Sequence, residues 1–234
     1  MRVFALIVFI SAGVFAENLP DWYIPLREAV YEQQLTADQI VPLYREVSNR
    51  ARQTLSGPAM YVALSRCEYM MGRVYQFENR KEEAAARYAE GIEWAEKALD
   101  ERASAEAWQM LAENISQSCV VRPTTYAMAN GLKVEKYSKN ALSLNGRNAA
   151  AQYMIAARWV FAPAPFHNYR KGIEMMSAII NDGDMDKDDR FNVYSAIGYA
   201  YVQQKKTSDA RPWFQRSLEI YPTNKYVGEM LSKL

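Results

Sequence analysis

The stretch from Phe191 to Asn224 constrains the fold most, because it has the pattern of two amphipathic helices joined by a short polar turn. Apolar residues recur three and four positions apart in its first half, so they lie on one face of a helix. Gly198 leaves bare backbone on that face, which lets a second helix approach closely. A second apolar stripe follows from Ala210 and ends at a proline. We therefore predict a helical hairpin with small residues where the helices cross.

A second hairpin with the same spacing is predicted over residues 59–99. Gly72 precedes Ala84 by 12 residues, and Gly198 precedes Ala210 by the same 12. An aromatic residue follows at the matching place in both, as Tyr88 and Phe214. Self-similarity of this kind indicates a stacked array of repeats.

Between these two hairpins lie two degenerate units with more residues between their stripes. The patterns predict enlarged turns over Ser116–Asn130 and Val160–Tyr169. Both turns join the first helix of a unit to its second. In a stack of hairpins with one orientation, we expect them to emerge as neighbours at the same edge.

The hairpin at Phe191–Asn224 resembles a tetratricopeptide repeat, which is a 34-residue unit. The resemblance implies an all-α, right-handed superhelical stack of about four such hairpins over residues 59–234, closed by a short capping helix at the C-terminus. Residues 17–58 are predicted to form an N-terminal helical pair. Its second helix begins with Thr36 and Gln39, which have the spacing of a capping box.

The array from about Ala59 is also similar to the tetratricopeptide proteins associated with TRAP-type transporters, the TatT family. Segments that carry this similarity are Tyr88–Leu99, Ser104–Leu111, Lys136–Leu142 and the proline-containing insertion before Arg170. The resemblance implies an exported protein that binds a small ligand or docks on a solute-binding protein. Those proteins usually carry a lipid-anchoring cysteine at the cleavage site, where this chain has Glu17.

The first 16 residues have the pattern of a secretory signal peptide. An apolar run from Val3 to Ile10 follows Arg2, and small residues precede a predicted cut after Ala16. The alternative is an uncleaved membrane anchor. We expect a periplasmic or otherwise exported protein without a lipid-anchor cysteine.

Charge and residue types argue against several classes of function. The formal net charge of +1 does not favour nucleic acid as a partner. His167 is the only histidine, so no catalytic triad or histidine metal site is recognisable, and we expect no catalysis, no cofactor and no metal. The acidic stretch from Asp182 to Asp189 lacks the glycine and glutamate of an EF-hand loop. It is interpreted as a solvated connector whose last acids cap a helix beginning near Arg190.

The two cysteines are predicted to be unpaired. In repeat register Cys67 and Cys119 differ by about 12 residues, or ~18 Å along a helix, whereas a disulfide needs Cα atoms within ~7 Å.

Two sets of residues are the candidate binding sites. One set occupies the face of each first helix that should line the groove of the stack: Arg66, Tyr69, Arg73, Gln109, Glu113, Tyr153, Ser195 and Tyr199. The other set lies in the two insertions at the loop edge: Tyr126, Trp159, Phe161, Phe166 and Tyr169. For the second set, the alternative is that the rings only cover helix ends.

Two functions remain open on this sequence. One is a protein-interaction scaffold, which binds a partner in the groove and along the loop edge. Candidates for this partner include a solute-binding protein and a transporter component. The other is a small-molecule-binding accessory of a TRAP-type transporter. An open groove with exposed Tyr and Arg favours the scaffold, and a closed apolar cavity beneath Trp159 and Phe166 favours the carrier.

Overall fold

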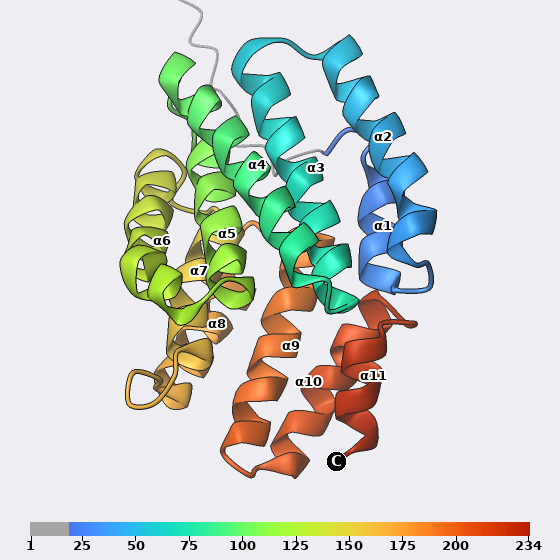
Figure 1. Cartoon of the computed structure of the whole chain (residues 1–234). Coiled ribbons are helices and arrows are strands. Elements are labelled where there is room, and N and C mark those ends of the chain that lie inside the picture. The colour runs from blue at the N-terminus through green and yellow to red at the C-terminus, as the bar shows by residue number, and fades with distance from the viewer. Residues whose placement is uncertain (1–18) are drawn as a thin grey trace, which may run out of the picture.

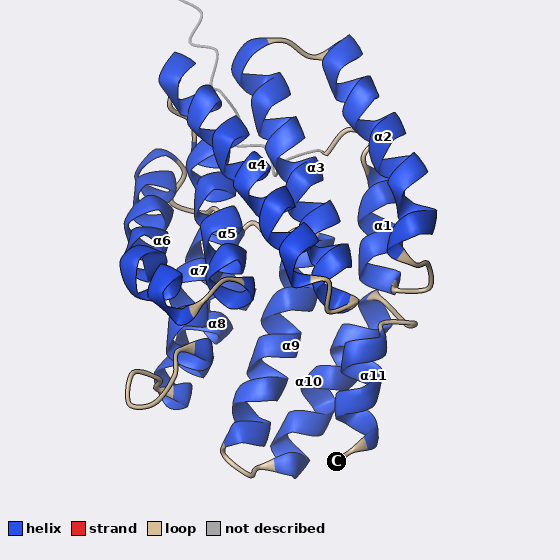
Figure 2. Ribbon diagram, viewed as in Figure 1, coloured by secondary structure: helices blue, strands red, loops and turns tan. Residues whose placement is uncertain are grey.

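The computed structural model describes residues 19–234, and within them all regular secondary structure is helical (Figure 2). One isolated bridge between Asn148 and Asp184 is the sole β-type pairing in that part of the chain. The helices are α1 (Ile24–Glu32), α2 (Ala37–Thr54), α3 (Gly57–Phe77), α4 (Lys81–Glu101), α5 (Ala105–Val121), α6 (Thr124–Leu144), α7 (Ala149–Phe161), α8 (Tyr169–Asp182), α9 (Lys187–Gln203), α10 (Thr207–Ile220) and α11 (Lys225–Ser232).

Four antiparallel hairpins, α3/α4, α5/α6, α7/α8 and α9/α10, form the body of the molecule (Figure 1). Each hairpin packs on the next, and the first helices α3, α5, α7 and α9 also contact one another in sequence. These four helices are the inner layer of the stack. The predicted all-α fold with four hairpins and a short last helix is therefore confirmed.

The predicted glycine crossings occur in both full repeats. A Cβ on Gly198 would lie 2.8 Å from Cε1 of Phe214, and one on Gly72 would lie 2.4 Å from Cε1 of Tyr88. Both aromatic side chains are completely buried. The equivalence of the two hairpins therefore has a packing basis, because each aromatic ring occupies the space that the glycine leaves empty.

The prediction of an enlarged turn over Ser116–Asn130 is wrong. The α5 helix continues to Val121 and α6 begins at Thr124, so the connection consists of Arg122 and Pro123. Pro123 interrupts the helical backbone there, and the residues on both sides are compatible with helix. The extra residues therefore lengthen the two helices instead of forming a loop.

The second insertion does form a loop, which runs from residue 162 to residue 168 between α7 and α8. Asn168 ends it by accepting a hydrogen bond from the backbone N–H of Lys171 at 3.0 Å, which caps α8. In Figure 1 the connection inside each hairpin is at the lower end of its two helices; that of α3 and α4 lies at mid-height, and those of α7 and α8 and of α9 and α10 lie lower. The end of α5, the start of α6 and the α7–α8 loop form what we call the loop edge.

The predicted N-terminal helical pair is present, and α1 begins at Ile24. The α2 helix begins as predicted, and the Thr36 N–H donates to Oε1 of Gln39 at 2.9 Å. Its partner α1 packs on α3 and also reaches the far end of the chain. The Tyr31 ring stacks on Tyr221 with centroids 4.8 Å apart, and the Asn224 side chain donates to the Tyr31 carbonyl at 2.7 Å. The N-terminal pair therefore connects the first repeat to the last.

No helix within residues 19–234 has both the length and the apolar content that crossing a membrane requires. The predicted signal peptide, residues 1–16, lies outside the described residues and stays a prediction.

Candidate functional site

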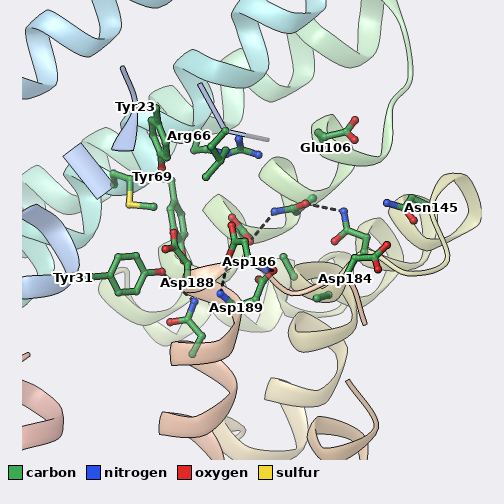
Figure 3. Close-up of a pocket in the computed structure, with 18 residues that line it drawn as sticks. Tyr23, Tyr31, Arg66, Tyr69, Glu106, Asn145, Asp184, Asp186, Asp188 and Asp189 are labelled. Carbon is green, nitrogen blue, oxygen red and sulfur yellow. Dashed lines mark hydrogen bonds between the residues drawn. The ribbon is translucent and has the colours of Figure 1, made fainter. Parts of the chain in front are cut away.

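A partly enclosed cavity of about 90 Å³ lies on the inner layer, between the start of α1 and the helices α3, α5, α7 and α9 (Figure 3). Four of the predicted groove residues line it, namely Arg66, Tyr69, Gln109 and Glu113. Their helices bring together positions that the repeat register placed on one face. This cavity is the candidate site.

A short hydrogen-bonded chain crosses the floor of the cavity. The Gln109 side chain donates to Oε1 of Glu113 at 3.3 Å, and the Asn148 side chain donates to Oε1 of Gln109 at 2.8 Å. Asn148 also caps α7, because its side-chain oxygen accepts from the backbone N–H of Ala151 at 2.8 Å. The start of α7 therefore holds the α5 side chains in place.

Helix α1 covers part of the predicted groove. Arg73 donates to the hydroxyls of Tyr31 and Tyr69 at 3.1 and 3.3 Å, and its guanidinium lies 4.8 Å from the centre of the Tyr31 ring. Burial raises the pKa of Tyr69 to about 12, so this hydroxyl stays protonated. Arg73 therefore joins α1 to α3 and does not line the cavity.

Three further groove candidates also lie outside the cavity. Tyr153 and Tyr199 are partly buried, and the ring of Tyr199 contacts Phe161 with centroids 5.2 Å apart. Ser195 is buried, and its hydroxyl donates to that of Ser217 at 3.1 Å. The repeat register in the sequence placed these residues on the inner layer. It did not show which of them line the cavity and which pack against a neighbouring helix.

The acidic connector contributes four of the acidic side chains that line the cavity, so its interpretation as a solvated segment is wrong, whereas the prediction that its last acids cap the next helix is confirmed. Helix α9 begins at Lys187, three residues earlier than expected, because Asp186 and Asp189 cap it reciprocally. Asp188 is only 8% exposed and accepts a hydrogen bond from the Tyr221 hydroxyl at 2.7 Å. Burial, together with neighbouring Asp186, raises the pKa of Asp188 to about 7.

The predicted residues of the loop edge divide into exposed and covered rings. Phe161 and Phe166 are 50% and 64% exposed. Trp159 lies under the side chains of Arg158 and Lys171, whose charged groups are 5.2 and 3.8 Å from its ring centre. Two tyrosines are partly buried: Tyr126 lies under Arg122, and Tyr169 stacks on His167 and packs against the core.

Sequence reasoning missed two groups of residues. Tyr23 and Tyr31 of the N-terminal pair line the cavity, and nothing in their local pattern indicates which repeat they face. Met128 and Leu132 of α6 are 80% and 71% exposed, and Val120 at the end of α5 is 63% exposed. Met128 and Leu132 are four residues apart, so the sequence could have shown that they lie next to each other on one face of a helix.

Residues with metal-binding or redox chemistry do not gather in the described part of the chain. No group of three His, Cys, Asp or Glu side chains within residues 19–234 has an arrangement that could hold a metal ion. Cys67 is buried and Cys119 is half-buried, and both are free thiols.

The comparisons with known proteins agree with the repeat seen in the sequence. Residues 191–224 match the tetratricopeptide repeat family. The prediction that this stretch is one such repeat is therefore confirmed. No curated protein matches the chain at a significant level.

Two solved structures are similar in outline. One is described as "Crystal structure of YrrB: a TPR protein with an unusual peptide-binding site"; it is 14% identical, with 89% of this chain and 98% of that chain covered and a TM-score of 0.40. The other, of the APC/C hetero-tetramer Cut9–Hcn1, is 10% identical, with 91% and 55% covered and a TM-score of 0.28. Both TM-scores are below 0.5, so we infer no ligand from either structure.

Proposed function

Because a tetratricopeptide repeat ends this stack of four helical hairpins, we propose that the chain is a non-catalytic scaffold that binds a protein partner. The supporting observation is the loop edge, where Phe161, Phe166, Met128 and Leu132 are each at least half exposed. Large apolar side chains on a rigid helical frame favour protein partners, since association removes their surface from water.

The covering of Trp159 also favours the scaffold over the predicted carrier. Charged side chains of Arg158 and Lys171 lie over its ring. The cavity described above lies elsewhere, on the inner layer, and four aspartates line it: Asp184, Asp186, Asp188 and Asp189. The proposed partner therefore contacts the loop edge through apolar groups and the inner layer through polar ones.

The loop edge can be tested by comparing two changes of the same kind, each of which replaces an exposed large apolar side chain by serine. We expect Phe166→Ser to reduce the amount of partner that co-purifies with the protein from its own cells, because the variant removes exposed apolar contact area. Leu35→Ser, at a residue that is 44% exposed in the turn between α1 and α2, is the matched control and should retain the partner. Quantitative mass spectrometry measures both. Equal recovery from the two variants and the unchanged protein would contradict the proposal.

Export to the periplasm or another extracytoplasmic compartment is the second part of the proposal, and it is supported by the signal-peptide pattern of residues 1–16. We expect the mature protein to begin at Glu17. Amino-terminal sequencing of the protein isolated from fractionated cells measures this directly. A cytoplasmic protein that still begins at Met1 would rule export out.

A second candidate function is a small-molecule-binding accessory of a TRAP-type transporter, and the partly enclosed cavity of about 90 Å³ favours it. Native mass spectrometry of protein purified from its own cells distinguishes the two candidates. A retained small molecule supports the accessory role, and a retained protein supports the scaffold.

A further inference from the structure

The cavity on the inner layer has a strong excess of acidic groups. Among residues 19–234, six acidic side chains and one basic side chain, that of Arg66, line it; the acidic ones are Glu106, Glu113, Asp184, Asp186, Asp188 and Asp189. Figure 3 shows Arg66 on one side of the space and the α9 carboxylates on the other. The two sides therefore differ in charge, and the α9 side is the negative one.

Asp184 and Asp188 each have a basic partner among the described residues outside the lining. Asp184 pairs with Arg147, with Oδ1 and Nη2 2.7 Å apart, and Asp188 pairs with Arg27, with Oδ1 and Nε 3.4 Å apart. Asp186 and Asp189 are different, because each accepts only a backbone N–H of the other within the capping box, at 2.9 and 3.2 Å. One oxygen of each of these two carboxylates is left without a partner among the described residues.

The electrostatic environment of Asp189 reflects this arrangement. Burial raises the pKa of Asp189 well above its ordinary value, and the neighbouring carboxylates Asp186, Glu113 and Asp188 raise it further. Like charges that face one another across a cavity repel, and a bound cation removes that repulsion.

A separate observation also indicates a ligand here. Tyr23 lines the cavity and is 2% exposed, yet its hydroxyl has no hydrogen-bond partner among residues 19–234. Figure 3 shows the Tyr23 side chain pointing toward Tyr69, with Asp188 beyond it. A buried hydroxyl without a partner is unfavourable by ~1–3 kcal/mol, and a donor placed in the cavity would satisfy it.

We propose that this cavity binds a primary ammonium group, held by Asp186, Asp189 and the hydroxyl oxygen of Tyr23. An ammonium has three N–H donors and no acceptor, and Asp186, Asp189 and the Tyr23 hydroxyl, which all line the cavity, provide three acceptors. A cavity of about 90 Å³ has room for several water molecules, and therefore for an ammonium with a few methylene groups. This inference rests on the proposed binding function and specifies its chemistry: the group is either the lysine side chain of a protein partner or a free organic amine.

The direct test is calorimetric titration of the full chain with n-butylammonium chloride and, separately, with n-butanol as the neutral equivalent. We expect the ammonium compound to bind and the alcohol not to bind. Repeating the titration with a lysine tripeptide, free or acetylated at Nε, distinguishes the sources. Tighter binding of the free tripeptide than of butylammonium assigns the site to a partner lysine, and the reverse assigns it to a small amine.

Two acids at equivalent places on neighbouring helices provide a matched pair of variants. Asp189 is the third residue of α9 and Asp209 is the third residue of α10, where it is exposed and far from the lining of the cavity. We expect Asp189→Asn to weaken ammonium binding roughly tenfold to hundredfold, since a charge-assisted hydrogen bond is lost. Asp209→Asn should leave binding unchanged. Asparagine keeps an acceptor for the capping bond, so the fold of α9 is preserved.

Tyr23→Phe separates a binding role from a structural one. We expect this variant to weaken ammonium binding about fivefold and yet to melt at the same or a higher temperature without ligand, because it removes an unpartnered buried hydroxyl. Absence of butylammonium and lysine-peptide binding at millimolar concentration would overturn the inference, and so would equal affinities for Asp189→Asn and Asp209→Asn. Neither result bears on the proposal that a partner binds at the loop edge, which the Phe166→Ser comparison tests separately.

Discussion

At the scale of single residues, Asp188 links the stability of the fold to pH. It is buried, accepts from Tyr221 and lies beside Arg27, and its pKa is raised to about 7 by burial and by Asp186. The pKa of an aspartate in the unfolded chain is about 3.9. The folded state therefore holds this proton more tightly than the unfolded state does. The contribution of Asp188 to the free energy of unfolding is largest at low pH and falls as pH rises from about 4 to about 7.

The variant Asp188→Asn removes this titration while keeping an acceptor for the Tyr221 hydroxyl. We expect the free energy of unfolding of the unchanged protein to fall, relative to that of the variant, between pH 4.5 and pH 7.5. Urea denaturation at several pH values measures the difference. If the two proteins follow parallel curves across this range, Asp188 is already ionised in the fold and the assignment is wrong.

At the scale of elements, α1 is the helix whose contacts extend furthest along the chain. Its Tyr31 contacts the rings of Tyr221 and Phe191, and its hydroxyl accepts from Asn192 at 3.1 Å. Lys187 of α9 also pairs with Glu28 of α1. A nine-residue helix has little stability by itself, so it owes its place to these contacts.

The contribution of this helix can be measured with two changes at Tyr31. We expect Tyr31→Ala to lower the free energy of unfolding by about 3–5 kcal/mol, since a fully buried ring leaves a cavity between α1 and α9. Tyr31→Phe keeps the ring contacts and should cost only about 1 kcal/mol through lost hydrogen bonds. Hydrogen exchange should become faster in α11 for the alanine variant. Unchanged exchange in α11 would show that α1 does not stabilise this C-terminal helix.

At the scale of the whole molecule, the chain departs from a simple linear array. In repeat proteins each unit contacts mainly its neighbours, so that stability is close to a sum of local terms. Here Glu32 accepts a hydrogen bond at its carbonyl from the Thr223 hydroxyl at 2.8 Å, although 191 positions separate the two residues. The N-terminal pair also brings Tyr31 of α1, and Tyr23 directly before this helix, to the wall of the cavity.

Much of the fold followed from local patterns in the chain. The spacing of apolar residues identified helices, and the repeated 12-residue interval between Gly72 and Ala84 and between Gly198 and Ala210 identified matching hairpins. The same register placed Arg66, Tyr69, Gln109 and Glu113 on one surface, and all four line the cavity. It failed at Ser116–Asn130, because a longer spacing between stripes is equally compatible with a loop and with two longer helices.

By itself, then, the sequence determined the helical hairpins, their number and the glycines at their crossings, since periodicity and residue size act over a few neighbouring turns. Only the tertiary structure decided which surface α1 covers, that the acidic connector faces a cavity, and that the Tyr23 hydroxyl is buried there without a partner among residues 19–234. An apolar face shows that a helix must be buried but not against which element. Asn224, which bonds to Tyr31 of α1, lies 193 residues away along the chain, beyond the range of any local pattern.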